Sequence, residues 1–227
     1  MLLPTVVAPR VSYVAARRSV HFLAACLAVL AAAFAAPALA APVQIVCLGD
    51  SLSAGYLLPA DAAFPAVLEK ALRARGLEVR VANAGVSGDT TSGGLARLDW
   101  SVTQGTDVVI LELGANDMLR GIAPKIARDN LDAMLARLQA RGIKVLLAGM
   151  LASPDLGRAY QQEFEAIYPD LARKFGVPLD PFFLEGVTGA AGMNLPGDSL
   201  HPSRAGVEAM VRRVLPLAEA LVRDVRR

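Results

Sequence analysis

Short apolar runs alternate with longer amphipathic stretches between residues 43 and 223. The apolar runs have the length of buried strands, and they predict strands at 43–48, 79–82, 107–113, 144–148 and 177–179. The longer stretches predict helices at 62–75, 124–141, 157–175 and 203–223. Strands that alternate with helices indicate a parallel sheet covered on both faces. We therefore expect an α/β single domain, a three-layer α/β/α sandwich with a central parallel sheet of about five strands.

Two of the predicted helices carry further signals. In 124–141, one helical face collects five apolar side chains, namely Ile126, Leu131, Met134, Leu135 and Leu138. Gly142 follows the end of this helix. The last helix begins after Ser203, whose hydroxyl fits an N-cap.

Polar clusters follow three of the predicted strands, at the point where each strand ends. They are Asp50-Ser51, residues 87–90 and Asn116-Asp117. In open parallel sheets, sites form beyond the carboxyl ends of the strands. A fourth polar segment, residues 198–201, lies just before the last helix.

Residues 1–40 have the three parts of a secretory signal. They contain Arg10, Arg17 and Arg18 and no acidic residue, then an apolar run at 20–36, then Ala38-Leu39-Ala40. We expect cleavage after residue 40, a single domain over 41–227, and a periplasmic or secreted protein. The apolar run is near the lower length limit for a membrane span, so an uncleaved anchor is the alternative.

Removal of this leader changes the charge of the chain. The precursor has a formal net charge of +2, whereas 20 basic and 21 acidic residues remain after the leader, a charge of −1. This balance gives no reason to expect a nucleic-acid partner. Cys47 is then the one remaining cysteine, which leaves no internal disulfide, and its apolar neighbours indicate a buried small hydrophobe. One cysteine and one histidine also argue against a zinc site.

The one histidine outside the leader is His201, and Asp198 precedes it by three residues. This segment lies between Pro196 and Pro202. It can fold the carboxylate onto one imidazole nitrogen and leave the other nitrogen for a serine. A polar turn that caps the last helix is the alternative.

The string Gly-Asp-Ser-Leu occurs twice, at 49–52 and at 197–200. The first copy follows an apolar strand, which places Ser51 at the mouth of the sheet as a candidate nucleophile. The second copy has no strand before it and leads into His201. The alternative for Ser51 is a helix-capping hydroxyl.

Two further residues can stabilise a negative oxygen. Asn116 follows the strand at 107–113, and its amide can donate to an oxyanion or cap the helix near Pro124. Gly88 lies in a polar turn, where a glycine lets a backbone N–H approach a ligand closely.

Taken together and in this order, these residues resemble the sequence blocks of the SGNH (GDSL) hydrolases. The chain most resembles their periplasmic arylesterase, thioesterase and lysophospholipase branch. The matching stretches cover 49–55, 87–90, 93–98 and 112–121, and the resemblance extends over essentially all of 41–227. It implies the flavodoxin-like SGNH hydrolase fold.

The resemblance also implies roles for single residues. Ser51 matches the nucleophile, His201 the base and Asp198 its partner. The N–H groups of Ser51 and Gly88 and the side-chain amide of Asn116 match the three oxyanion donors. The loop 118–124, which includes Met118 and Leu119, matches a segment that lines the acyl groove in relatives. Pro124 departs from the family pattern and leaves the acyl-length preference open.

We expect a serine esterase that hydrolyses aryl or acyl esters, and also thioesters or lysophospholipids, through an acyl-serine intermediate. Apolar residues near the motifs favour an acyl or aryl group over a sugar: Leu57, Leu58, Met118, Leu119 and Leu151. A carbohydrate O-acetylesterase is the nearest alternative, although Trp100 is the one tryptophan available for stacking on a sugar. A catalytically silent binding protein is the remote alternative. No metal or organic cofactor is implied, and we expect a monomer without a stable membrane anchor.

Overall fold

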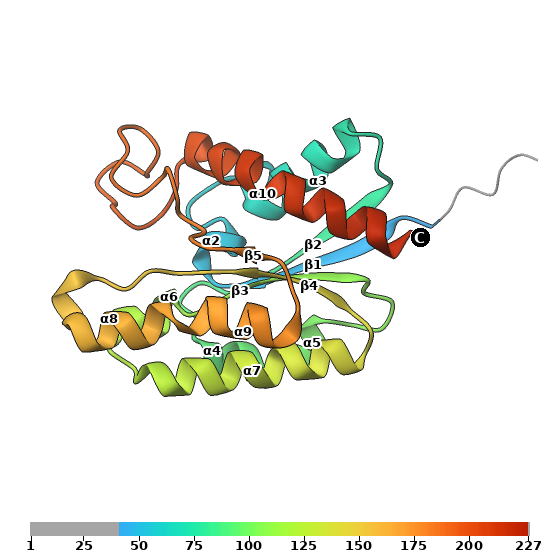
Figure 1. Ribbon diagram of the computed structural model, residues 1–227. Coiled ribbons are helices and arrows are strands. Elements are labelled where there is room, and N and C mark those ends of the chain that lie inside the picture. The colour runs from blue at the N-terminus through green and yellow to red at the C-terminus, as the bar shows by residue number, and fades with distance from the viewer. Residues whose placement is uncertain (1–40, 227) are drawn as a thin grey trace, which may run out of the picture. The chain divides into compact units, whose positions relative to one another are not determined.

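The computed structural model describes residues 41–226, so the predicted leader lies outside the described residues. Five parallel strands form one sheet in the order β2-β1-β3-β4-β5 (Figure 1). The strands are β1 (Val43–Gly49), β2 (Val79–Gly85), β3 (Val108–Glu112), β4 (Lys144–Ala148) and β5 (Leu179–Asp180). The strand order reverses between β1 and β3, and parallel sheets of this kind bind ligands beyond the carboxyl ends of the two strands at such a point.

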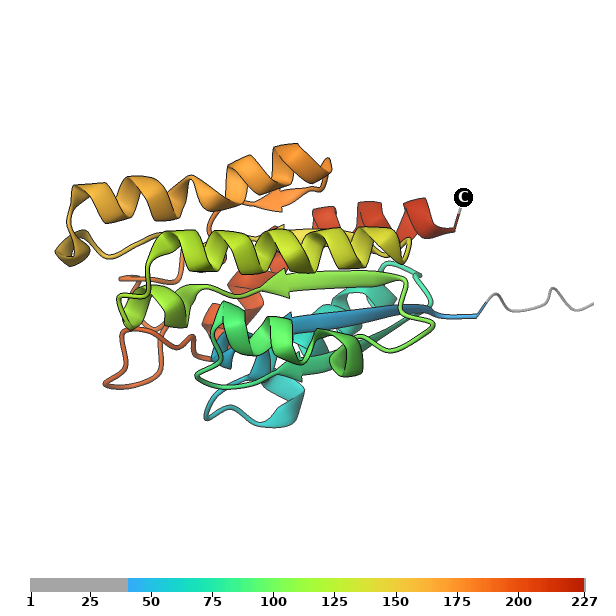
Figure 2. The ribbon, with the colours of Figure 1, turned by 90° about the horizontal axis from the view of Figure 1, so that it is seen from below.

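Helices cover both faces of the sheet, which confirms the three-layer α/β/α architecture (Figures 1 and 2). One face carries α3 (Phe64–Ala74) and α10 (Arg204–Val225). The other carries α4 (Thr91–Ala96), α5 (Leu98–Ser101), α7 (Pro124–Ala140), α8 (Arg158–Glu165) and α9 (Ile167–Phe175). Two short helices, α2 (Ser51–Ala54) and α6 (Ala115–Leu119), directly follow β1 and β3, and 3-10 turns occupy Ala60–Ala62 and Pro154–Leu156.

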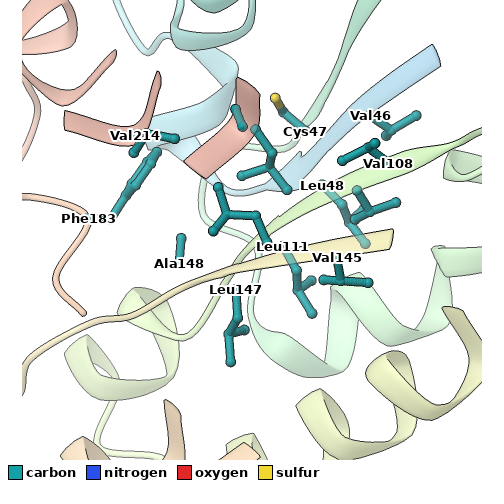
Figure 3. Packing of buried hydrophobic residues seen from close by; sticks show 14 of the residues in the cluster. Val46, Cys47, Leu48, Val108, Leu111, Val145, Leu147, Ala148, Phe183 and Val214 are labelled. Carbon is teal, nitrogen blue, oxygen red and sulfur yellow. The ribbon is translucent and has the colours of Figure 1, made fainter. Parts of the chain in front are cut away.

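The core lies on both sides of the central strands, as expected for a parallel sheet between two helical layers. Figure 3 shows Val214 of α10 and Phe183 on one side of β4, with Leu147 pointing to the other side. Cys47 is fully buried in β1, which confirms its interpretation as a small hydrophobe, and burial raises the pKa of its thiol. Within residues 41–226, no helix combines the length and the apolar character that a membrane crossing needs.

The sequence predicted one helix over 157–175, but the structure contains two, α8 and α9, divided at Ala166. Pro169 explains the division. Proline has no N–H to donate to the carbonyl four residues earlier, so it suits the first turn of a helix and interrupts a helix interior. Here Pro169 lies in the first turn of α9.

The predicted face of α7 is wrong at one position. Leu131, Met134, Leu135 and Leu138 are buried, but Ile126 is 46% exposed. Ala127 is buried in its place, because it lies one helical turn before Leu131 and so shares its face. The prediction that Ser203 caps the last helix is confirmed, since its hydroxyl accepts a hydrogen bond from the Gly206 N–H of α10.

Candidate active site

Ser51, His201 and Asp198 come together at the carboxyl end of β1. Ser51 is the first residue of α2, directly after the strand. Its Oγ lies 3.0 Å from Nε2 of His201, and Nδ1 of the same ring lies 2.6 Å from Oδ2 of Asp198. Ser199, from the second Gly-Asp-Ser-Leu string, lines the same cavity but makes no hydrogen bond with His201 within the described chain. The geometry therefore distinguishes the two copies and selects Ser51.

Asp198 also organises the turn that carries the histidine. Its Oδ1 accepts hydrogen bonds from the backbone N–H groups of Leu200 and His201, at 2.7 and 3.0 Å. These bonds, the Leu200 bond first, lower the pKa of Asp198 to about 2. The alternative interpretation of residues 198–201 was a polar turn that caps the last helix. These residues do form a polar turn, but Ser203 caps the helix.

An aromatic ring packs against the imidazole. The Tyr56 and His201 ring centroids are 4.4 Å apart with an interplanar angle of 36°. Sequence analysis did not identify Tyr56, since no spacing rule connects it with a histidine so far along the chain. Its ring narrows the space that His201 can occupy.

Three hydrogen-bond donors are available beside Ser51. Within residues 41–226, the backbone N–H groups of Ser51 and Gly88 have no hydrogen-bond partner. The third donor is Asn116, whose Nδ2 uses one of its two hydrogens on Oδ2 of Asp50, at 3.0 Å. All of these residues line one cavity. Asn116 lies inside α6, and Ala123 occupies the N-cap of α7, so the helix-cap alternative for Asn116 is wrong.

The loop of Gly88 is held by two arginines. The φ of Gly88 is +81°, which an L side chain rarely adopts. Arg97, almost completely buried, donates to the carbonyls of Gly49 and Ala84 and pairs with Asp89 at 2.6 Å. Arg120 donates to the Gly88 carbonyl at 2.6 Å. These bonds hold the backbone directly after the Gly88 N–H, which is one of the three donors.

Two carboxyl groups lie beneath the site, and sequence analysis assigned neither of them a role. Asp50 and Glu112 are both fully buried. Burial raises the pKa of Asp50 to about 6, while hydrogen bonds from Leu52 and Asn116 oppose the rise. Burial, and then the charge of Asp50, raise the pKa of Glu112 well above its ordinary value. The sequence signal that could have identified Glu112 is that it is the one acidic residue among the apolar residues of β3.

The cavity beside Ser51 has a volume of about 770 Å³. Its apolar lining includes Met118, Leu119, Met150, Leu151 and Phe182. No lysine or arginine of the described chain lines it, and no group of three or more His, Cys, Asp or Glu in 41–226 is arranged to hold a metal ion.

Three of the five apolar residues predicted near the substrate, Met118, Leu119 and Leu151, line the cavity. The expectation is wrong for the other two. Leu58 packs against the hydrophobic core, and Leu57 is 76% exposed with a φ of +57°.

A family model described as the GDSL-like Lipase/Acylhydrolase family matches residues 47–209. Esterase TesA of Pseudomonas aeruginosa is 39% identical over 184 residues, 81% of this chain and 91% of that protein. An arylesterase of Vibrio mimicus is 43% identical over 160 residues, 70% of this chain and 80% of the relative. A thioesterase 1/protease 1/lysophospholipase L1 of Escherichia coli is 41% identical over 166 residues, 73% of this chain and 78% of the relative.

Solved structures agree with these relatives. The crystal structure of TesA superposes with a TM-score of 0.74 at 39% identity, covering 78% of this chain and 99% of that one. AlinE4, described as an SGNH-hydrolase family esterase, superposes with a TM-score of 0.68 at 43% identity, covering 82% of this chain and 98% of the other.

Proposed function

The chain belongs to the GDSL-like lipase/acylhydrolase family and is a carboxylic ester hydrolase, and on that premise we propose that Ser51 is its nucleophile, His201 its base and Asp198 the partner of that base. The observation that carries this assignment is the unbroken chain of contacts from Ser51 Oγ through the imidazole to Asp198. A serine is a weak nucleophile until an adjacent base removes its proton, and His201 lies at hydrogen-bonding distance for that transfer.

In the first half of the reaction, Ser51 Oγ attacks the ester carbonyl carbon while Nε2 of His201 takes the serine proton. The carbonyl oxygen becomes negative and accepts hydrogen bonds from the N–H groups of Ser51 and Gly88 and from Asn116. The tetrahedral intermediate collapses, and the imidazolium gives its proton to the leaving alcohol or thiol. Water then attacks the acyl-serine with His201 again as base, which releases the acid and restores Ser51.

The cavity favours an uncharged acyl or aryl group as the substrate part that enters it. Its lining is largely apolar and contains no described lysine or arginine that could pair with a phosphate. Relatives are named arylesterase and thioesterase/lysophospholipase, which supports aryl esters, and also thioesters or lysophospholipids whose charged parts remain outside. Trp100 is exposed and does not line the cavity, which disfavours the carbohydrate O-acetylesterase.

The proposal includes the cellular location and the oligomeric state of the protein. The leader predicted in residues 1–40 directs export, and cleavage leaves a periplasmic or secreted monomer without a membrane anchor. A monomer suffices because all proposed catalytic groups come from one chain.

A p-nitrophenyl ester series from acetate to palmitate tests the function, with lysophospholipid and acyl-CoA assayed beside it. We expect a burst of p-nitrophenol equal to the enzyme concentration and covalent labelling of Ser51 by a fluorophosphonate. Ser51→Ala should abolish both with the fold intact. Ser199→Ala, in the second Gly-Asp-Ser-Leu string, is the matched control that should retain both the burst and the labelling of Ser51. Labelling at Ser199, or turnover by Ser51→Ala, would refute the assignment.

A further inference from the structure

Asp50 connects the nucleophile turn to the third oxyanion donor. Its Oδ1 accepts a hydrogen bond from the Leu52 N–H at 3.0 Å, which caps α2. Its Oδ2 accepts from Nδ2 of Asn116, also at 3.0 Å. Each oxygen of the Asp50 carboxylate therefore accepts a hydrogen bond from an N–H donor, one from Leu52 and one from Asn116.

This arrangement decides which end of the Asn116 amide faces the cavity. A carboxylate accepts and does not donate, so it can pair only with the NH2 end of that amide. The second hydrogen of Nδ2 then remains for an oxyanion. With a donor in place of Oδ2, the amide would turn and present its carbonyl oxygen to that donor.

Glu112 binds the backbone of Asp50. Its Oε2 accepts from the Asp50 backbone N–H at 3.1 Å and from the Ser53 hydroxyl at 2.8 Å, while its Oε1 is buried without a partner. A Cβ at Gly49 would lie 2.3 Å from Oε2, so this close packing requires the glycine. A buried carboxyl oxygen without a donor favours the protonated acid, which leaves Asp50 as the charged member of the pair.

We propose that Asp50 is a positioning residue that fixes the amide orientation of Asn116, and that Glu112 beneath it keeps the Asp50 backbone in place. The proposal rests on the function proposed above for Asn116. It predicts that the acceptor at Asp50 Oδ2, and not the size of the side chain, maintains the third oxyanion donor.

The sharpest test compares Asp50→Asn with Asp50→Ser. Asparagine caps helices well, so the Leu52 N–H keeps its acceptor and the new NH2 must face Asn116. That amide should then turn, and kcat should fall about 10²-fold with KM little changed, as for loss of an oxyanion donor. Serine also caps α2 but is too short to reach Asn116. The Asn116 amide then loses its partner without being turned around, so kcat should fall less than in Asp50→Asn. A purely structural cap predicts the opposite order, because asparagine is the closer isostere.

A double-mutant cycle with Asn116→Ala separates this inference from the proposed function. If Asp50 acts through Asn116, Asp50→Asn should change kcat less than about 3-fold in the Asn116→Ala background. An equal loss in both backgrounds would overturn the positioning role and leave the serine mechanism intact. An Asn116→Ala enzyme with wild-type kcat would instead overturn the oxyanion assignment itself. If Asp50→Asn does not fold, Asp50→Ser in both backgrounds completes the same cycle, and an equal loss there overturns the inference.

Discussion

Asp198 contacts His201 with both of its carboxylate oxygens. Oδ2 lies 2.6 Å from the ring Nδ1, and Oδ1 accepts the backbone N–H of the histidine at 3.0 Å. One carboxylate thus holds both the ring and the backbone of His201, the proposed base. The two oxygens are not equivalent, and substitutions at position 198 can separate their contributions.

Asp198→Asn should keep the backbone acceptor but put a donor in place of the acceptor that faces the ring. The new NH2 group would donate to Nδ1, which forces the tautomer that presents N–H to Ser51. We expect kcat to fall about 10⁴-fold with the melting temperature little changed, and His201→Ala to cost as much as Ser51→Ala. Steady-state hydrolysis of p-nitrophenyl butyrate measures this. Wild-type rates in His201→Ala would end the triad assignment.

The acid side of the pH–rate profile should include the protonation of Asp50. Its pKa is raised to about 6, and the carboxylate must be ionised to orient Asn116. Asp198 does not contribute, because its pKa is lowered to about 2. Besides Glu112, the titratable groups near Asp50 are His201 and Tyr168. We expect log(kcat/KM) to fall more steeply with decreasing pH below pH 6 in the wild type than in Asp50→Ser. Equal slopes in the two enzymes would contradict a role for Asp50.

Asn116 can be tested by a pair of substitutions. Asn116→Ala should lower kcat by about 10²–10³-fold with little change in KM, because the donor acts mainly on the transition state. Asn116→Asp keeps the shape but places a carboxylate beside both Asp50 and the oxyanion, so it should be at least as damaging. Kinetics on one activated ester, with melting temperatures as the control for folding, give the comparison. An active and stable Asn116→Asp enzyme would refute the role as donor.

Glu112 should make the protein less stable as the pH rises. Its folded-state pKa is raised by burial, so between the unfolded value, about 4.3, and the folded value the native state binds the extra proton. The free energy of unfolding then decreases with pH, by up to about 1.4 kcal/mol per pH unit. Glu112→Gln retains the acceptor and cannot ionise. Urea unfolding should show that the free energy of unfolding of the variant, relative to that of the wild type, is higher at pH 9 than at pH 5. A constant difference would mean that Glu112 is ionised in the native state.

The leader can be tested directly. Ala38-Leu39-Ala40 gives small residues at both positions required for cleavage, so the exported protein should begin at Ala41 or within a few residues of it. N-terminal sequencing of the protein recovered from the periplasm or medium measures this. Ala40→Pro is a matched variant that should retain the leader. Lipid on Cys26, or an intact leader on the wild-type protein, would contradict cleavage.

The sequence predicted the fold, and the place of Ser51 at the end of a strand, because both rest on local patterns. Apolar runs predict buried strands, and polar residues directly after them lie at one edge of the sheet. The role of Glu112 depended on a neighbour 62 residues away, Asp50, and the packing of Tyr56 on His201 depended on the path of the last loop. Such contacts between distant segments leave no periodicity. The prediction for Ile126 was wrong for a different reason: near the start of α7, positions 126 and 127 both fit the apolar face about equally well until packing selects one.

Ser51 and His201, the proposed nucleophile and base, are 150 residues apart. The histidine turn is attached to the start of α10 through Ser203, which bonds to the backbone of Gly192 and Met193. Local folding of β1 and α2 therefore cannot by itself give Ser51 a proton acceptor. A chain whose residues 198–203 have not yet docked is consequently inactive under the proposed mechanism. Recovery of esterase activity during refolding should therefore report the docking of this last segment.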